Sequence, residues 1–370
     1  MPEDINKKPF DEATITKLEI FERYLEAWLP VFINAPFSGS LLVCDFFAGS
    51  GYDAEGTPGS PMRILKTVEK FREGIIKKAM RIRVVLNERN IGKATILESR
   101  MLSEIEQIRR QFGDLISLDC CNEDFGEFFN ARYADFGAQP NLMFIDQYGI
   151  KEVNDAIFRR LIALEKTDFL FFISSSILRR FPEEESVRTY FPDLNANAIR
   201  NAGHENAHRA ILDYYRRKIP AGNSMKLYPF SIRKAANIYG LIFGSKHPLG
   251  VEKFLNIAWD KNRLNGEANF DIDDDMEKRQ GSLFPELQRL TKLELFEREL
   301  GEYIRESGEV TNRDVYDFTL AHGHAPRHGR DVMMKLRKEG KIDCDAQIGC
   351  SYKSCHKDRS IRTIKAVKNG

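Results

Sequence analysis

Acidic residues follow four successive apolar segments in the first half of the sequence. They are Asp45, Glu88, Asp119 with the nearby Asp124, and Asp146. Ligands of open α/β sheets bind where the parallel strands end, so these positions would share one ligand-binding edge. Glu88 could then accept hydrogen bonds from both hydroxyls of a ribose, and Asp124 from the exocyclic amine of an adenine. Such charges can also be solvated loop residues, but four in succession favour a nucleoside site.

A glycine-bearing turn connects the first of these carboxylates to the following segment. Asp45 to Gly51 reads Asp-Phe-Phe-Ala-Gly-Ser-Gly, directly after the apolar run Leu41–Cys44. Glycine lets the backbone approach a ligand where a Cβ atom would collide. The turn also nearly fits a dinucleotide fingerprint, with Gly49, Gly51 and Ala54 in the three small positions.

The acidic edge fits S-adenosylmethionine, whose sulfonium is positive and which needs no pyrophosphate cradle. The residues expected to bind this cofactor are Asp45, Phe47, Ala48, Gly49, Gly51, Glu88, Asn122, Asp124 and Asp146. The alternative is a nicotinamide dehydrogenase. Such an enzyme would have a strand and a helix where this chain has the long loop Tyr52–Pro61, and it would lack an antiparallel last strand.

The segment Asp146-Gln147-Tyr148-Gly149 is the candidate catalytic site. It is similar to the Asp-Pro-Pro-Tyr box of amino-methyltransferases, where an oxygen pair holds the target amine and an aromatic ring stacks on the base. Methyl transfer is an in-line displacement, so positioning the nucleophile supplies most of the catalysis. Here the aromatic residue comes one position early and Gln147 stands where the proline is expected. A plain ligand-edge or structural role is the alternative.

The elements that would position these residues alternate between strands and helices. We expect strands at 41–44, 82–86, 115–118, 141–145 and 168–173, and helices at 14–29, 61–70, 94–112 and 154–165. Pro30 and Pro36 are expected to end the first helix. This alternation predicts a parallel α/β sheet with right-handed crossovers.

The pattern changes after residue 173. A mostly helical insert is expected at 177–219, followed by strands at 225–232 and 238–243 that form an antiparallel pair at one sheet edge. The acidic segment Asp271–Glu277 is predicted to be an exposed linker.

Three short helices and two strand-like runs follow residue 290, a pattern typical of a winged helix. Residues 321–370 carry seven more Lys and Arg than Asp and Glu, which leaves residues 1–320 at about −6. A helix is expected at 326–338. The residues predicted to bind nucleic acid are Arg327, Arg330, Lys335, Arg337, Lys338 and Lys353. The alternative is that this basic face docks on the acidic first domain.

Two motifs raise the question of a metal site. His204-Glu205-Asn206-Ala207-His208 matches the His-Glu-x-x-His pattern of zinc proteases, but no third ligand follows at a suitable distance. Cys344, Cys350, Cys355 and His356 lack a Cys-x-x-Cys knuckle. We therefore predict no metal site and assign free thiols to the wing.

Length and composition are those of a soluble globular protein. The chain has 370 residues, 42% hydrophobic residues and a net charge of +1. We expect a large domain at 1–280 and a small one at 284–370. No apolar run of 18 residues or leader segment is recognised, and the adjacent Cys120 and Cys121 are a poor start for a disulfide framework. A cytoplasmic protein with no membrane contact is expected.

Several segments together resemble the three-Cys-motif partner family of bacterial proteins. They are Asp45–Gly51, Gly56-Thr57-Pro58-Gly59-Ser60-Pro61, Phe144–Gly149, Phe243–Pro248 and the basic C-terminal region. The resemblance implies a Rossmann-like class I methyltransferase sheet, mostly parallel with an antiparallel last strand, and a small C-terminal winged-helix domain. It also implies S-adenosylmethionine as cofactor and nucleic acid, DNA or RNA, as substrate.

The same resemblance implies an alternative function. The chain would then be a non-catalytic scaffold that recruits a three-Cys-motif, radical-SAM-like protein to nucleic acid. Gln147, in place of the family's usual proline, is the departure on which this choice depends.

Overall fold

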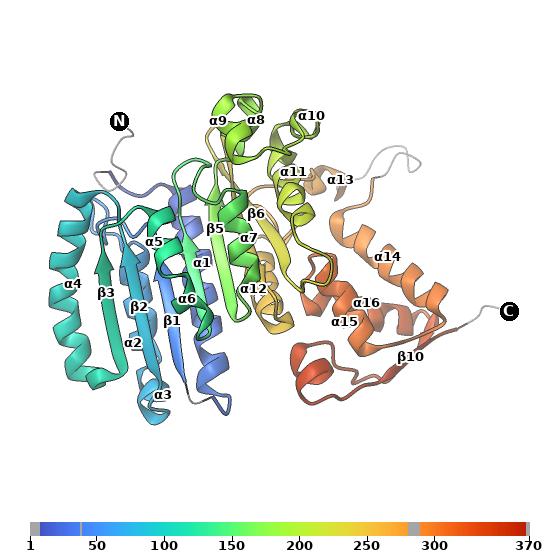
Figure 1. Ribbon diagram of the computed structural model, residues 1–370. Helices are drawn as coiled ribbons and strands as arrows, with labels where there is room; N and C mark the ends of the chain where they lie inside the picture. Colours follow the sequence, from blue (N-terminus) through green and yellow to red (C-terminus); the bar gives the residue numbers. More distant parts are fainter. Residues whose placement is uncertain (1–7, 38, 280–288, 368–370) are drawn as a thin grey trace. The chain divides into compact units, whose positions relative to one another are not determined.

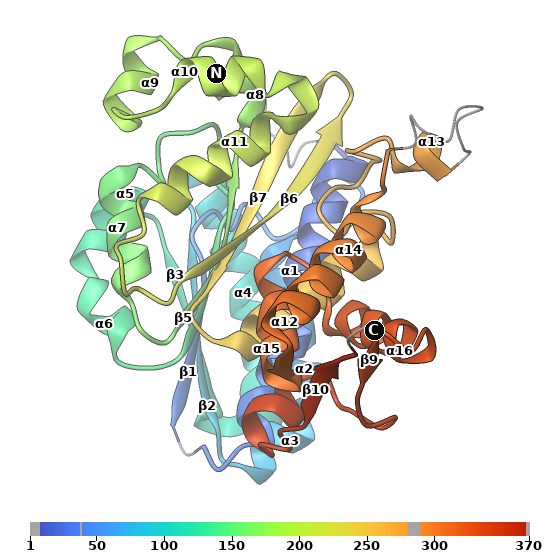
Figure 2. The ribbon, with the colours of Figure 1, turned by 90° about the vertical axis from the view of Figure 1, so that its right-hand side faces the viewer.

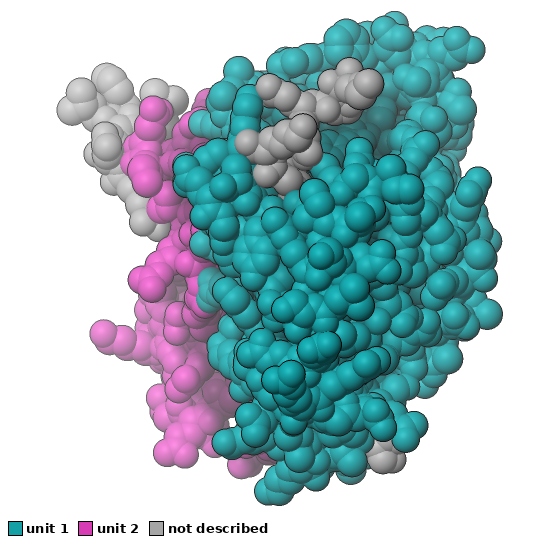
Figure 3. Space-filling view, turned by 90° about the vertical axis from the view of Figure 1, so that its left-hand side faces the viewer, with its two compact units in different colours: residues 1–246 teal, residues 247–370 magenta. Residues whose placement is uncertain are grey.

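The computed structural model describes residues 8–37, 39–279 and 289–367 (Figure 1). The chain divides into two compact units, Met1–Lys246 and His247–Gly370, which Figure 3 colours separately. The predicted boundary between residues 280 and 284 lies outside the described residues. The second unit includes helix α12 (Pro248–Lys261).

The first unit is built on a seven-stranded sheet with the order β3-β2-β1-β4-β5-β7-β6. The strands are β1 (Ser40–Asp45), β2 (Arg81–Asn87), β3 (Ile116–Cys121), β4 (Asn141–Ile145), β5 (Thr167–Ile173), β6 (Lys226–Lys234) and β7 (Asn237–Ser245). β1 to β5 run parallel, whereas β7 is antiparallel to both β5 and β6. This confirms the predicted mostly parallel α/β sheet with its antiparallel last strand.

Helices cover both faces of this sheet (Figures 1 and 2). α1 (Glu12–Ile33) precedes β1. The helices between the parallel strands are α2 (Ser60–Lys70), α3 (Arg72–Lys77), α4 (Ile91–Phe112), α5 (Phe125–Ala131), α6 (Tyr133–Gly137) and α7 (Asp155–Ala163). α1 packs on the sheet through Phe21, whose ring stacks on Phe144 of β4 with centroids 4.2 Å apart. α7 covers the opposite face (Figure 2).

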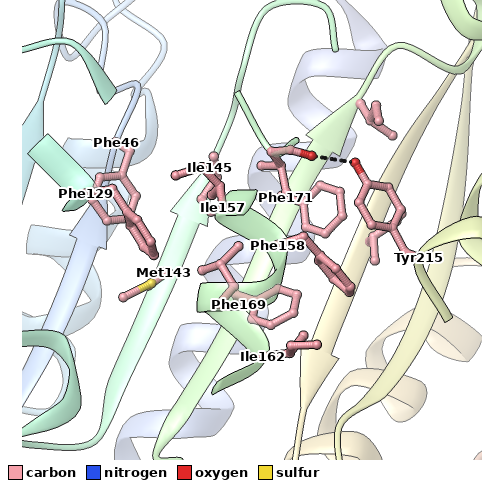
Figure 4. Packing of buried hydrophobic residues seen from close by; sticks show 14 of the residues in the cluster. Phe46, Phe129, Met143, Ile145, Ile157, Phe158, Ile162, Phe169, Phe171 and Tyr215 are labelled. Atoms are coloured by element: carbon pink, nitrogen blue, oxygen red, sulfur yellow. Dashed lines mark hydrogen bonds between the residues drawn. The ribbon is translucent and has the colours of Figure 1, made fainter. Parts of the chain in front are cut away.

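The core on the α7 face is rich in aromatic rings. Alternate residues of β4 and β5, such as Met143 and Phe169, point to this face, because successive side chains of a strand point to opposite sides. Phe46 packs edge-on against the rings of α5, and Tyr215 donates a hydrogen bond of 2.8 Å to the carbonyl of Val153 (Figure 4). This packing fixes the loops that leave β1 and β4.

Helix α1 is longer than the sequence predicts. It continues to Ile33, with Pro30 inside its last turn. A proline there removes one backbone donor near the helix end, and its own carbonyl still accepts from the amide of Asn34 at 3.0 Å. The prediction that Pro30 ends the helix is therefore wrong.

The insert after β5 is helical, as predicted. It contains α8 (Ser175–Arg180), α9 (Glu185–Tyr190), α10 (Ala196–Asn201) and α11 (Gly203–Arg217). The first three lie at the end of the sheet where β5 finishes, and α11 packs along β6 and β7 (Figures 1 and 2). His208 of α11 is completely buried, and its ring lies within 3.1 Å of the Ser175 hydroxyl. A Cβ atom on Gly240 of β7 would come within 1.8 Å of this ring, so a glycine is required there.

The second unit contains a helical cluster and a small antiparallel sheet. Besides α12 its elements are α13 (Asp275–Arg279), α14 (Lys292–Ser307), β8 (Glu309–Thr311), α15 (Asn312–Ala321), α16 (Pro326–Lys338), β9 (Ile342–Asp343) and β10 (Thr363–Ala366). The sheet order is β8-β10-β9. Capping boxes begin α14 at Thr291 and α15 at Thr311.

In the wing, β9 and β10 pair antiparallel, and a helical turn at Lys353–Lys357 lies in their connection. One prediction for this unit needs correction, because the acidic segment is not an exposed linker. Asp275 is completely buried and accepts hydrogen bonds from the Lys292 amide and the Lys278 ammonium, so its charge is compensated.

Among the described residues no helix combines the length and apolar character needed to cross a membrane. All six cysteines are free thiols.

Candidate cofactor and acceptor site

A cavity of about 400 Å³ opens in the first unit, where β1, β2 and β4 end. It brings together seven of the residues predicted from the sequence. They are Phe47, Ala48, Gly49, Glu88, Asp146, Gln147 and Tyr148. Distant parts of the chain thus meet at the carboxyl edge of the sheet, where α/β folds bind their ligands.

The glycine turn after β1 is tied to Glu88 at the end of β2. The Gly49 amide donates to Glu88 Oε2 at 2.9 Å, and the Asn90 amide donates to Oε1 at 2.8 Å. Gly49 has φ +63°, which glycine adopts without strain. A carboxylate offers about four acceptor positions, so Glu88 keeps roughly two for a ligand.

The loop from Gly51 to Gly59 is folded back on itself. The Gly59 amide donates to the Gly51 carbonyl at 2.8 Å, and a Cβ atom at Gly59 would lie 3.1 Å from that oxygen. Asp53 accepts from the amides of Glu55, Thr57 and Phe10 at 2.7–2.9 Å. Burial tends to raise the pKa of Asp53, but the three amides stabilise its charged form and lower its pKa overall.

Asp45 lies at the end of β1 and is completely buried, so it does not line the cavity. Its Oδ1 accepts from the Phe47 amide at 3.2 Å, and its Oδ2 has no hydrogen-bond partner among the described residues. Burial raises the pKa of Asp45 to about 7. The nearby Asp146 and Glu88 carboxylates add to this effect, against the Ser60 hydroxyl and the Phe47 amide.

Asp146 is paired with a lysine that the sequence analysis did not identify. The Lys17 ammonium of α1 lies 2.6 Å from Oδ1 and 2.5 Å from Oδ2 of Asp146. It also lies 4.5 Å from the centre of the Phe172 ring, which lines the same cavity. A lysine on an amphipathic helix carries no sequence signal of this kind, since its partner is 129 residues away.

Gln147 is 1% exposed and connects the cavity to the following loop. Its carboxamide oxygen accepts from the amides of Glu152 at 2.8 Å and Val153 at 3.3 Å. These two donors fix the orientation of the amide group. Its nitrogen Nε2 has no hydrogen-bond partner among the described residues. Tyr148, next to it, is 54% exposed, with the Lys93 ammonium 5.9 Å from the ring centre.

Three other predicted cofactor residues lie outside the cavity lining. Gly51 contributes the carbonyl that accepts from Gly59. Asn122 donates to the carbonyls of Glu88 and Arg89 at 2.6 and 3.0 Å. Asp124 accepts from the Gly126 amide at the start of α5 and lies 3.2 Å from the Arg89 guanidinium.

Another part of the cavity lining was not predicted. It is formed after β5 and along the β6–β7 pair by Ser174, Ser176, Ile177, Arg180, Lys234, Asn237 and Tyr239. These residues belong to the insert and the edge strands, where the sequence shows no motif.

In the second unit the predicted nucleic-acid residues differ in their surroundings. Arg327 is paired with Asp260 at 3.0 Å, and Lys335 is paired with Glu297. Arg330, Arg337 and Lys338 are exposed on α16. Lys353 is exposed in the helical turn between the wing strands.

Residues of the two metal motifs make contacts with other parts of their own unit. His208 is buried between Ser175 and the Leu241 carbonyl, while Glu205 is paired with Arg233. Cys355 is buried and its thiol donates to the Asn312 carbonyl. Within the described ranges, no group of three or more metal-ligating side chains is found.

Comparisons with known proteins bear on each unit. No curated protein sequence matches the chain. A solved structure of an O-methyltransferase from Bacillus cereus in complex with SAH has 14% sequence identity and a TM-score of 0.32; the match covers 64% of this chain and 91% of that one. The solved structure of M. jannaschii TYW2 in complex with AdoMet has 10% sequence identity and a TM-score of 0.28. That match covers 64% of this chain and 76% of that one.

Residues 271–349 match the family model of the GMT-like wHTH domain. The first unit is thus a mostly parallel α/β sheet, and residues 271–349 match a winged helix-turn-helix domain.

Proposed function

We propose that this chain is an S-adenosylmethionine-dependent methyltransferase that acts on nucleic acid. One observation carries the proposal. The glycine turn, Glu88 and the Asp146–Gly149 segment line a single cavity at the carboxyl edge of a methyltransferase-like sheet. The further proposal, that the chain is a three-Cys-motif partner protein, is supported by its winged helix-turn-helix match.

The residues around the cavity fit the proposed cofactor. Glu88 would accept hydrogen bonds from the ribose hydroxyls with the acceptor positions that Gly49 and Asn90 leave unused. The pKa of the buried Asp45 is raised to about 7, and a positively charged ligand nearby would favour its ionised form. When bound, the cofactor supplies an electrophilic methyl group. Asn122 and Asp124 stay assigned to the adenine side, next to Glu88.

The Asp146–Tyr148 segment would hold the acceptor. Asp146 would accept from the acceptor's amine, and the exposed Tyr148 ring would stack on the base. A base in a duplex would have to be flipped out to reach this position. The winged helix would supply affinity for the phosphate backbone through Arg327, Arg330, Lys335, Arg337, Lys338 and Lys353.

Labelled methyl transfer tests this proposal. The purified chain, given labelled S-adenosylmethionine, is expected to label DNA or RNA. Tyr148→Ala should abolish the transfer while leaving the affinity for S-adenosylhomocysteine nearly unchanged. Tyr133→Ala, at a ring outside the cavity, serves as the control.

A specific observation favours the non-catalytic alternative. The Lys17 ammonium already contacts both oxygens of Asp146, the position proposed for a substrate amine. In this second function the chain binds the cofactor and recruits a three-Cys-motif, radical-SAM-like protein to nucleic acid. Cofactor binding without transfer to any nucleic acid, with or without that protein, would support it.

A further inference from the structure

One wall of the cavity, formed by residues that follow β4 and by residues of β5, α8 and β7, presents polar groups unlike those of the glycine turn. Gln147 is buried with its oxygen held by two backbone amides, while Nε2 has no partner among the described residues. A buried donor left unpaired costs free energy, so a ligand that accepts from it gains affinity. Gln147 lines the cavity, so a ligand that reaches the buried Nε2 would supply the hydrogen-bond acceptor that this group lacks.

An aromatic pair lines the same wall. The rings of Phe172 on β5 and Tyr239 on β7 stack with centroids 5.3 Å apart and planes 20° apart. Both residues line the cavity and both are only half-buried. Because the Lys17 ammonium lies 4.5 Å from the centre of the Phe172 ring, a planar base would pack at the Tyr239 side of the pair. Such stacking does not depend on which base is present.

An arginine stands on this wall as well. Arg180, the last residue of α8, is exposed and lines the cavity. Its guanidinium donates to Asn237 Oδ1 at 2.7 Å. In the described part of the chain this neutral amide is its one polar partner, so the charge is oriented but not neutralised. An arginine held in this way suits a phosphate group.

We propose that this wall binds one nucleotide unit of the substrate strand. The Phe172–Tyr239 pair packs against the base, Gln147 Nε2 donates to a ring nitrogen or carbonyl oxygen of the base, and Arg180 binds a flanking phosphate. The inference rests on the proposed function, and it names the unit that the acceptor site recognises. Tyr148 remains available for the second face of the base.

Binding of a short single-stranded oligonucleotide to the full-length chain tests the phosphate contact. Arg180→Gln should weaken binding about tenfold at low salt and reduce the logarithmic salt slope by about 0.7. Arg188→Gln is the matched control, because Arg188 is exposed on α9 and does not line the cavity. Equal slopes for the two variants would overturn the assignment of Arg180.

Two further variants test the contacts to the base. Gln147→Glu keeps an oxygen for the Glu152 and Val153 amides but removes the donor, and Tyr239→Ala removes one ring. Each should weaken the oligonucleotide about tenfold while S-adenosylhomocysteine binds as in wild type. Wild-type oligonucleotide affinity in both would overturn the subsite.

Failure of the proposed function would look different. A wild-type chain that does not bind S-adenosylhomocysteine contradicts the cofactor site, while the Arg180 comparison still reports on the nucleotide subsite. If the variants lose oligonucleotide binding but the wild-type chain transfers no methyl group, the nucleotide subsite is supported and the methyltransferase function is contradicted.

Discussion

Asp45, the last residue before the glycine turn, is completely buried, and its Oδ2 has no hydrogen-bond partner among the described residues. Its pKa is raised from 3.8 to about 7, so the folded chain holds a proton there between about pH 4 and 7 that the unfolded chain releases. The stabilisation from this proton is present at low pH and is lost as the pH rises through 7. Such a residue is expected where charge serves ligand binding rather than stability.

Asp45→Asn should therefore stabilise the first unit at pH 8. The expected gain is about 1–4 kcal/mol, because the buried charge is removed while the side-chain oxygen for the Phe47 amide is kept. Denaturant unfolding at pH 5 and pH 8 measures it. Asp53→Asn should instead lower the free energy of unfolding of the first unit at pH 8, because the pKa of Asp53 is lowered and its ionised form is stabilised in the folded chain. Greater destabilisation by Asp45→Asn at pH 8 than at pH 5 would contradict this account.

The Lys17–Asp146 pair permits a second residue-level prediction. Lys17→Met should lower the free energy of unfolding by roughly 1–3 kcal/mol, because Asp146 loses the cation that contacts both of its oxygens. Adding Asp146→Asn should recover part of the loss. The two single variants and the double variant form a thermodynamic cycle. Strictly additive effects would show that the two side chains do not interact.

At the scale of elements, the packing of α11 on β7 depends on one glycine. A Cβ atom at position 240 would meet the His208 ring at 1.8 Å, far inside contact distance. Gly240→Ala should cost about 2 kcal/mol or more. Because His208→Ala removes the ring, the double variant should lose less stability than the sum of the two single variants. Thermal unfolding compares all three, and additive losses would contradict this packing.

Helix α16 presents Arg330 and Arg337 two turns apart, so both lie on one exposed face. If this face contacts duplex phosphates, Arg330→Gln with Arg337→Gln should reduce the logarithmic salt slope of DNA binding by about two. Arg298→Gln with Arg305→Gln removes the same charge at the same spacing on α14. Identical slopes for the two pairs would argue that α16 does not touch phosphate.

At the scale of the whole molecule, the two units should differ in their response to acid. Burial and the nearby charge of Lys292 lower the pKa of His324 to about 2. Burial and the charges of Arg327 and Lys292 lower the pKa of His328 to about 4. Both histidines are neutral in the folded second unit and gain protons on unfolding below about pH 6.5. Their stabilising contribution is therefore lost as the pH falls from 6.5 towards 4.

Hydrogen exchange, measured segment by segment from pH 7 to pH 4.5, reads out this difference. The second unit should lose protection from exchange at a higher pH than the first unit. In His328→Gln the protection of the second unit should depend less on pH. An unchanged pH dependence in His328→Gln would contradict the assignment.

The sequence predicts the sheet because buried parallel strands are continuous apolar runs, and it predicts the glycine turn because few residues adopt that backbone. It does not predict Lys17 or Arg180. Each acts through a partner that only the tertiary fold brings near, Asp146 and Asn237 respectively. The continuation of α1 past Pro30 was missed for a related reason, since packing overrides a local helix-breaking signal near a helix end.

Calorimetric titration of the whole chain with S-adenosylmethionine, S-adenosylhomocysteine and NAD measures whether the first unit binds the proposed cofactor. The first two should bind and NAD should not. Glu88→Ala should weaken binding by about ten- to a hundredfold, because a hydrogen bond to a charged group is lost. Glu123→Ala, at an exposed carboxylate outside the cavity, should bind as wild type. Unchanged affinity in Glu88→Ala, or binding of NAD alone, would contradict the account.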